Sequence, residues 1–279
     1  MLKIEYDGAN FHGWQRQREK RTVQGELEGV LSRLCGQEIL LHGASRTDAG
    51  VHALGQTACF SAEMSIPTDR LLIAANNTLS GGKAKSGRTA GDVRIIGAAE
   101  KPPGFHARYD AVGKTYVYLI RNAVRTDVFV HDRCWQLREM LDLRRMEEAA
   151  KHMTGTHDFR AFQASGGNPV RSTVRTVYAL SVEEIPPILN PALPKGSGGK
   201  DGRGWIRIKV TGDGFLYNMV RIMTGTLVET GLGRREPADA GAALAAGLRR
   251  YAGCTAPPQG LYLTEVYYDR ADMEAESSV

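Results

Sequence analysis

The residues best suited to chemistry lie in one short stretch, residues 42–55, in which Asp48 follows Arg46 by two positions and precedes an Ala-Gly pair. Small residues after a polar Ser-Arg-Thr-Asp run are typical of a tight turn, where glycine permits backbone angles that other residues resist. Residues 56–60 are predicted to form a strand, so Asp48 would lie at the end of a sheet. Such a carboxylate has three ordinary roles, as turn former, helix N-cap or ion-pair partner, beside that of an ionised catalytic group.

Arg221 lies in a largely apolar stretch, residues 215–228, whose periodicity predicts a helix with Asn218, Arg221 and Gly225 along one stripe. An arginine among apolar residues usually needs a carboxylate partner. The alternatives are a guanidinium that extends to solvent and one that pairs with a structural acid.

Tyr116 and Tyr118 lie on one face of a strand predicted over residues 115–121. Aromatic residues on strands more often serve packing than catalysis. The spacing alone therefore does not separate Tyr116 from an ordinary core residue.

Motifs for cofactors, metals and hydrolysis are absent from the sequence. It contains no GxGxxG, GxxxxGK[ST] or GxSxG motif. His42, Asp48 and His52 lack the helical HxxxH spacing of a zinc site. We therefore expect no metal and no cofactor. The four cysteines form no CxxC pair and suit free thiols in a reducing cytosol; they are Cys35, Cys59, Cys134 and Cys254.

A series of motifs resembles the bacterial tRNA pseudouridine synthase A family, and residues 43–55 resemble its catalytic signature. The matches follow the family's order from residue 2 to about residue 268. The other matching segments are residues 4–8, 13–17, 105–109, 114–118, 155–159, 212–221 and 256–263.

The resemblance implies an enzyme that isomerises uridine to pseudouridine at positions 38, 39 and 40 of the tRNA anticodon arm. It implies that Asp48 is the nucleophile or charge stabiliser, that Tyr116 stacks on the target base and is a candidate for removing the C5 proton, and that Arg221 pairs with Asp48. Arg46 is a candidate RNA contact near the flipped nucleotide. Arg16 and Arg108 are further candidate RNA contacts, although a solvated basic loop explains Arg16 equally well.

Length, charge and hydropathy fit an enzyme of this kind. The chain has 279 residues and a formal net charge of +5, which supports nucleic-acid binding only weakly. No apolar run reaches the roughly 18 to 20 residues of a membrane helix, and the first residues lack a signal peptide's apolar region. We expect a cytoplasmic homodimer that binds tRNA, the dimer being implied by the resemblance. Cations expected to line a track for the RNA include Arg207, Lys209, Arg18 and the Lys83–Arg88 loop.

The elements alternate in an α+β pattern. We expect two domains, residues 1–104 and 105–270, each a mostly antiparallel sheet with helices on one face, meeting at a basic cleft. Residues 271–279 are predicted to be a disordered tail. Further strands are predicted over residues 2–6, 93–98, 174–182, 205–210 and 261–267, and helices over 23–34, 68–79 and 142–153. The strand over 174–182 is expected to alternate, with Val174, Thr176, Tyr178, Leu180 and Val182 on one side.

Two Gly/Lys-rich segments, near residues 80–91 and 190–204, are interpreted as surface insertions, and the first has cations that would reach RNA backbone.

Two other functions stay open. One is a non-catalytic RNA-binding protein, which loss of Asp48, Tyr116 or Arg221 would favour. The other is a sister isomerase with a different RNA target.

Overall fold

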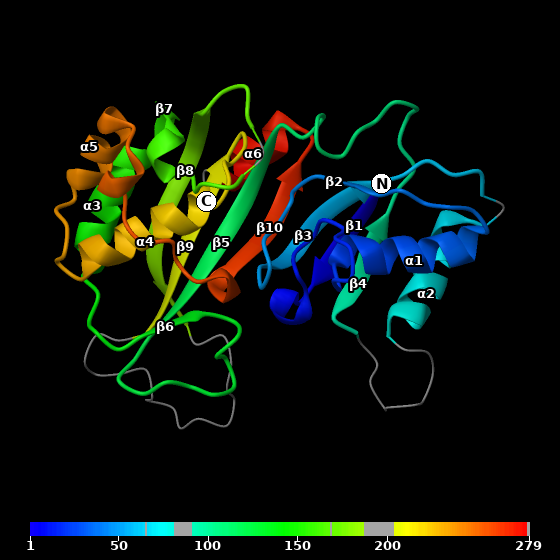
Figure 1. The fold of residues 1–279 in the computed structure, drawn as a ribbon, viewed down its shortest axis with the longest axis horizontal. Coiled ribbons are helices and arrows are strands. Elements are labelled where there is room, and N and C mark those ends of the chain that lie inside the picture. The colour runs from blue at the N-terminus through cyan, green and yellow to red at the C-terminus, as the bar shows by residue number, and fades with distance from the viewer. Residues whose placement is uncertain (65, 81–90, 168, 187–203, 278–279) are drawn as a thin grey trace. The chain divides into compact units, whose positions relative to one another are not determined.

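The computed structural model describes residues 1–64, 66–80, 91–167, 169–186 and 204–277 (Figure 1). The chain divides into two compact units. The first joins Met1–Val112 to Tyr262–Arg270, and the second joins Gly113–Leu261 to Ala271–Val279. The boundary predicted after residue 104 falls inside the first unit, and the last strand of the predicted second domain also belongs to that unit. The Lys83–Arg88 loop and residues 190–203 lie outside the described residues.

The strands of the first unit follow the order β4-β1-β3-β10, with β2 paired to β3. Strand β3 is antiparallel to β1 and parallel to β10, where Tyr262 pairs with His52. Leu2, Ile4 and Tyr6 alternate with partly exposed residues, as expected for a strand with one buried face. The strands are β1 (Leu2–Tyr6), β2 (His42–Gly43), β3 (His52–Cys59), β4 (Val93–Ala98) and β10 (Leu261–Tyr267).

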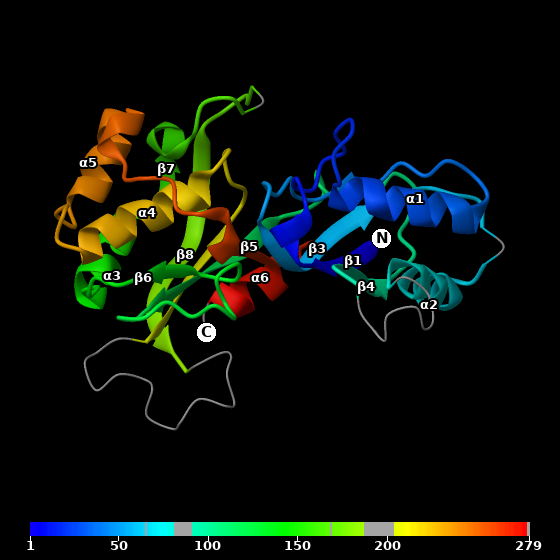
Figure 2. The same ribbon diagram turned by 60° about the horizontal axis from the view of Figure 1, so that its bottom comes forward.

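Helices α1 (Val23–Cys35) and α2 (Thr68–Leu79) pack against each other in this unit, and α2 also packs on β4 (Figure 2). Helix α1 begins where the Thr22 hydroxyl accepts a hydrogen bond from the N–H of Gly25, and it ends at Gly36 in the left-handed conformation. The predicted bounds of both helices are confirmed to within a residue. A short 3-10 helix, η1, covers Gly8–Asn10.

The strands of the second unit follow the order β5-β9-β8-β7, with each neighbouring pair antiparallel, and β6 pairs with β5 in parallel. The prediction of an α+β protein whose strands are mostly antiparallel is confirmed. The strands are β5 (Gly113–Asn122), β6 (Trp135–Leu137), β7 (Gly155–Asp158), β8 (Val174–Ile185) and β9 (Trp205–Gly212).

Helix α3 (Leu143–Met153) packs against β8 and against α4 (Met219–Gly231), and α5 (Asp239–Ala246) packs against α3. Asp142 caps α3 by accepting hydrogen bonds from two backbone N–H groups of its first turn. Short 3-10 helices cover Phe159–Phe162 (η2), Arg249–Tyr251 (η3) and Pro258–Gly260 (η4).

Two predictions about these elements are wrong. Strand β8 does not alternate strictly, because its register shifts between Val177 and Ala179, so that Val177 and Val182 are buried while Tyr178 is exposed. The tail is not disordered as far as Ser277, since Arg270–Ser277 form helix α6. Met273 is buried there against Gly113, where a Cβ atom would lie 2.2 Å from its sulfur.

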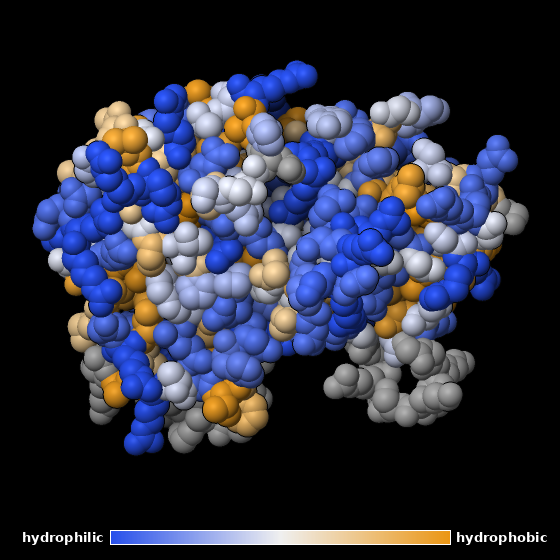
Figure 3. Space-filling model, in the orientation of Figure 1, coloured by the Kyte–Doolittle hydropathy of each residue, from blue (hydrophilic) through white to orange (hydrophobic). Residues whose placement is uncertain are grey.

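Figure 3 shows a face covered mainly by hydrophilic residues, with apolar residues scattered among them. None of the helices within the described residues has the length and apolarity needed to cross a bilayer. All four cysteines are free thiols, as predicted, and burial raises the pKa of Cys134 to about 12.

Candidate active site

Asp48 lies half-buried in the turn between β2 and β3, in the first unit. The backbone around it is tied to neighbouring segments. The carbonyl of Thr47 accepts a hydrogen bond from the N–H of Trp14 (3.0 Å), and the carbonyl of Asp48 accepts one from Val51 (3.2 Å). The N–H of Gly50, whose φ is 78°, donates to the carbonyl of Phe11 (3.4 Å). These bonds fix the direction of the backbone on both sides of the carboxylate.

Two buried side chains hold the same turn. The Tyr6 hydroxyl lies 2.6 Å from the hydroxyl of Thr47. The amide of Gln56, which is fully buried, accepts a hydrogen bond from the N–H of Ser45 (3.1 Å) and donates one to its carbonyl (2.8 Å). A buried amide paired at both ends is costly to displace, so the turn that carries Asp48 is rigid.

Close packing explains two glycines next to this turn. Gly13 has a φ of 85°, and a Cβ atom there would lie 2.7 Å from the carbonyl oxygen of Thr47. A Cβ atom on Gly43 would lie 2.4 Å from the indole nitrogen of Trp14, which is itself buried. Glycine at both positions therefore allows Trp14 and its neighbours to pack directly under the Asp48 turn.

The three arginines predicted to contact RNA all lie in the unit that holds Asp48. Arg46 and Arg108 are exposed. Arg16 is also largely exposed, and its guanidinium lies 3.3 Å from the carboxylate of Glu28. Arg16 is thus partly neutralised and held against helix α1.

Gln24 and Glu28 position the loop that carries Gln15 and Arg16, and neither was predicted from the sequence. Each is almost fully buried on α1, where Oε1 of Glu28 accepts hydrogen bonds from Gln24 (2.9 Å) and from the N–H of Leu41 (2.9 Å). Oε1 of Gln24 accepts the N–H of Arg16 (2.9 Å) and the side-chain amide of Gln15 (2.7 Å). Two polar residues spaced four apart on the apolar face of a helix were the signal for this buried pair.

Tyr116 lies on β5 in the second unit, opposite Val210 of β9, and it is 7% exposed. Its ring meets that of Phe215 edge to face, with centroids 5.3 Å apart. Phe215 therefore supports the ring from one side and restricts its orientation.

Tyr118 is a packing residue. It is fully buried, and its hydroxyl donates a 2.7 Å hydrogen bond to the carbonyl of Pro257. Burial raises its pKa well above the ordinary value, although the positive charge of Arg221 opposes the shift. This hydroxyl stays protonated and structural.

Arg221 lies in the first turn of α4, also in the second unit. Its Nε donates to the carbonyl of Ala256 (2.7 Å), and its Nη1 donates to Oδ1 of Asn218 (2.7 Å). Helix α4 begins later than predicted, because Asn218 adopts the left-handed conformation with a φ of 60° and interrupts the apolar run that starts at residue 215.

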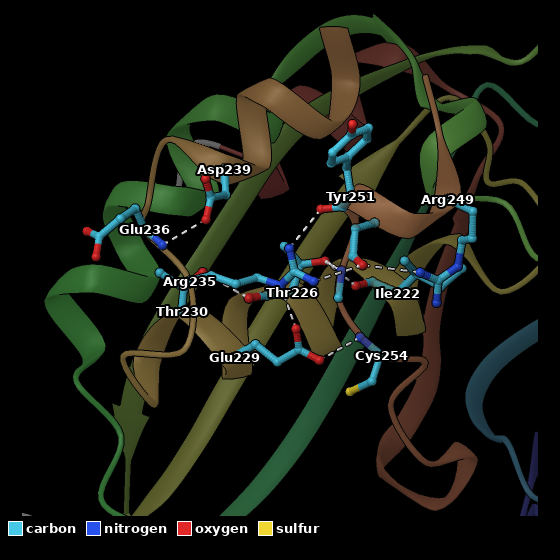
Figure 4. A network of polar contacts seen from close by, with 12 residues as sticks. Ile222, Thr226, Glu229, Thr230, Arg235, Glu236, Asp239, Arg249, Tyr251 and Cys254 are labelled. Atoms are coloured by element: carbon cyan, nitrogen blue, oxygen red, sulfur yellow. Dashed lines mark hydrogen bonds and ion pairs between the residues drawn. The ribbon is translucent and has the colours of Figure 1, made fainter. Parts of the chain in front are cut away.

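Residues 249–256, here called the strap, lie along helix α4 (Figure 4). The carbonyl of its last residue, Ala256, is the one that accepts the hydrogen bond from Arg221. Glu229 accepts hydrogen bonds from Nε of Arg235 (2.5 Å) and from the N–H of Cys254 (2.8 Å). Arg235 donates further hydrogen bonds to two carbonyls of the strap. A Cβ atom on Gly225 would lie 1.9 Å from the carbonyl oxygen of Cys254, so only glycine permits this approach.

The structure thus places Asp48 in one unit and Tyr116 and Arg221 in the other, and their meeting in one site stays a prediction. Within the described parts of the chain, no group of three or more His, Cys, Asp or Glu side chains is arranged to hold a metal ion.

Comparison with known proteins identifies the family. A family model described as tRNA pseudouridine synthase matches residues 3–110 and 149–269. The tRNA pseudouridine synthase A of Ruminiclostridium cellulolyticum is 42% identical over 267 residues, covering 96% of this chain and 98% of that protein. The protein of the same name from Moorella thermoacetica is 43% identical over 269 residues, with the same coverage. The resemblance noted in the motifs is therefore confirmed, and this chain belongs to the tRNA pseudouridine synthase family, a family of isomerases.

Proposed function

We propose that this protein isomerises uridine to pseudouridine at positions 38, 39 and 40 of the tRNA anticodon stem-loop, with Asp48 as the nucleophile. The observation that carries the proposal is the rigid turn around Asp48. Buried contacts from Tyr6 and Gln56 and the backbone bond from Trp14 all hold it. A nucleophile gains from such preorganisation because the chain loses little entropy when the reaction begins.

The reaction needs a carboxylate and a route for one proton. The C1′–N1 bond of the flipped uridine breaks, the detached uracil turns, and a C1′–C5 bond forms. C5 then loses its proton and N1 gains one, so substrate and product contain the same atoms. The Asp48 carboxylate would add either to C1′ of the sugar or to C6 of the base, and it is released unchanged in both cases.

Tyr116 and Arg221 take the remaining roles in the proposal. Tyr116 would stack on the target base and is our candidate for removing the C5 proton. Its support is the edge-to-face contact with Phe215, which orients the ring. Arg221 would pair with Asp48 and keep it ionised, because a nearby guanidinium lowers the pKa of a carboxyl group.

Binding would depend on phosphate contacts by a cytoplasmic homodimer. Arg46, Arg16 and Arg108 are the proposed contacts, and their support is the exposure of all three side chains. Affinity for tRNA should then fall steeply with added salt. Salt-independent binding, or full activity of a stable monomer in sedimentation, would contradict this part of the proposal.

The Asp48→Asn variant tests the function. It keeps the size of the side chain but removes its charge and nucleophilicity, so we expect pseudouridine formation in tRNA to fall by about 10³-fold or more. Affinity for tRNA should stay within about tenfold, since phosphate contacts supply most of the binding.

Asp142→Asn is the matched control. Asp142 caps helix α3, and asparagine caps helices about as well as aspartate, so this variant should keep full activity. Mapping of pseudouridine in tRNA after incubation with each protein distinguishes the outcomes. Turnover by Asp48→Asn close to that of the unchanged protein would refute the assignment, and modification at other uridines would identify a sister isomerase.

A further inference from the structure

Three aromatic rings form a ladder in the first unit that has no role in the proposed chemistry. The rings of His42 and His106 have centroids 5.2 Å apart, and those of His106 and Tyr109 have centroids 4.3 Å apart. Tyr109 is the outer ring and is 77% exposed, whereas His106 is half-buried. We call these three residues the ring ladder.

Two of the three rings, His106 and Tyr109, belong to one firmly anchored turn, residues 105–110. Ala107 is fully buried, its N–H donates to the sulfur of Cys59 on β3 (3.2 Å), and its carbonyl accepts a hydrogen bond from the hydroxyl of Tyr268 (2.8 Å). The same hydroxyl lies 2.6 Å from that of Thr57, also on β3. Two independent contacts thus tie the turn to the sheet.

Hydrogen bonds within the turn fix the middle ring. Nδ1 of His106 accepts the backbone N–H groups of Arg108 (3.0 Å) and Tyr109 (3.3 Å). The Asp110 carboxylate accepts the N–H of His106 (2.9 Å), and the N–H of Asp110 donates to the carbonyl of His106 (3.1 Å). Tyr109 is therefore exposed to solvent on a backbone that cannot easily turn it inward.

We propose that the ring ladder is a stacking platform for an unpaired base of the tRNA, with the ring of Tyr109 as the contact surface. An unpaired base offers a flat π-face that stacks on exposed aromatic rings, and proteins recognise RNA loops in this way. The proposal rests on tRNA being the substrate.

The charges around the ladder favour RNA over another protein surface. Arg108 is exposed next to Tyr109, and Lys101 lies over the ring of Phe105 at the start of the same turn. Asp110, the acidic residue of the turn, already accepts a hydrogen bond from the N–H of His106. A protein partner would need a wider apolar area, whereas two of the three rings here are histidines.

Two substitutions of Tyr109 test the platform. Tyr109→Ala removes the ring and should weaken tRNA binding by about tenfold, or about 1.4 kcal/mol, at constant salt. Tyr109→Phe keeps the ring and should bind within about twofold of the unchanged protein. Turnover at saturating tRNA should be unchanged in both, because neither variant alters the reacting groups.

Phe129→Ala is the control, since Phe129 is 80% exposed but belongs to the second unit and is not part of the ladder. It should leave tRNA affinity unchanged. Short-wavelength ultraviolet crosslinking of tRNA to the unchanged protein should modify the peptide that contains Tyr109.

Equal affinity of Tyr109→Ala and the unchanged protein, or equal weakening by Phe129→Ala, would overturn the platform. So would a loss of self-association in Tyr109→Ala with tRNA affinity intact, which would mark a contact between copies of the chain. A failure of the proposed function looks different, because the unchanged protein would then form no pseudouridine whatever the Tyr109 variants bind.

Discussion

Arg221 and Asn218 form a 2.7 Å hydrogen bond across the start of helix α4, between Nη1 of the arginine and Oδ1 of the asparagine. Asn218 can accept this bond because its left-handed backbone places it at the helix N-terminus. The bond to the carbonyl of Ala256 holds Nε of the same guanidinium. The plane of the guanidinium is thereby set by two acceptors before any substrate arrives.

Arg221→Leu should abolish most activity and change its pH dependence. If the guanidinium pairs with Asp48 as proposed, its loss raises the pKa of that carboxyl, so that the nucleophile ionises only at higher pH. The acid limb of the activity profile should therefore move to higher pH. Turnover measured from about pH 5 to pH 9 tests this. An unchanged profile would mean that the two residues do not interact.

Asn218→Gly separates the orientation of Arg221 from its charge. Glycine adopts a φ of 60° without strain, so the backbone is preserved while the acceptor for Nη1 is lost. We expect turnover to fall by about tenfold, with tRNA affinity and the pH profile close to those of the unchanged protein. A profile shifted like that of Arg221→Leu would show that Asn218 affects the charge and not only the geometry.

Tyr116→Phe tests whether the hydroxyl of Tyr116 takes part in proton removal. The ring and its contact with Phe215 are kept, so affinity for tRNA should change by less than about threefold. Turnover should fall by about 10²-fold or more if the phenol removes the C5 proton.

Tyr118→Phe is the paired control on the same strand. Its hydroxyl bonds to the carbonyl of Pro257, and losing that bond should cost about 1 to 3 kcal/mol of stability without reducing turnover at temperatures where the protein is folded. Normal turnover by Tyr116→Phe would leave Tyr116 as a base-stacking residue only.

Elements with local signals at both ends were predicted well. Helix α1 has a threonine cap and a left-handed glycine, and α2, β4 and β10 have the predicted bounds. Helix α4 was placed four residues too early, because the apolar residues before Asn218 belong to a turn whose left-handed residue periodicity does not reveal. The predicted alternation along strand β8 was wrong for a similar reason, since a bulge leaves no signature in hydrophobic spacing.

The supports of the candidate site depend on contacts between distant segments. The sequence indicated Asp48 and its tight turn, but it did not show that Gln56 and Tyr6 hold that turn from β3 and β1. It also did not show the buried Gln24 and Glu28. Such contacts join residues whose separation along the chain carries no periodic signal, so only the folded backbone reveals them.

Gly13→Ala should damage the Asp48 turn. The φ of 85° and the 2.7 Å approach of a Cβ atom to the carbonyl of Thr47 both oppose alanine. We expect a loss of about 1 to 3 kcal/mol in the free energy of unfolding and a fall in turnover beyond what reduced folding explains.

Gly29→Ala is its control, because it lies exposed in helix α1 with no atom within 4 Å of the added methyl group. This variant should be more stable by about 0.5 to 1 kcal/mol and fully active. Equal behaviour of the two variants in urea unfolding would contradict the close packing under the turn.

Glu229→Gln should weaken the strap in a manner that depends on pH. Burial alone would raise the pKa of Glu229, but the hydrogen bonds from Arg235 and from the N–H of Cys254 hold it below its ordinary value of 4.5. A carboxylate with a lowered pKa in the folded state stabilises the protein above its unfolded pKa and loses that effect as the pH falls through the folded value. The variant should therefore be less stable by about 1.5 to 3 kcal/mol at neutral pH, and the difference should shrink as the pH falls below about 4.5.

Glu236→Gln is the control. Glu236 is largely exposed and pairs with Arg145, so this substitution should cost less than about 1 kcal/mol of stability at any pH. Urea unfolding of all three proteins at neutral and acid pH measures both effects, and a difference independent of pH would show that the charge of Glu229 does not hold the strap.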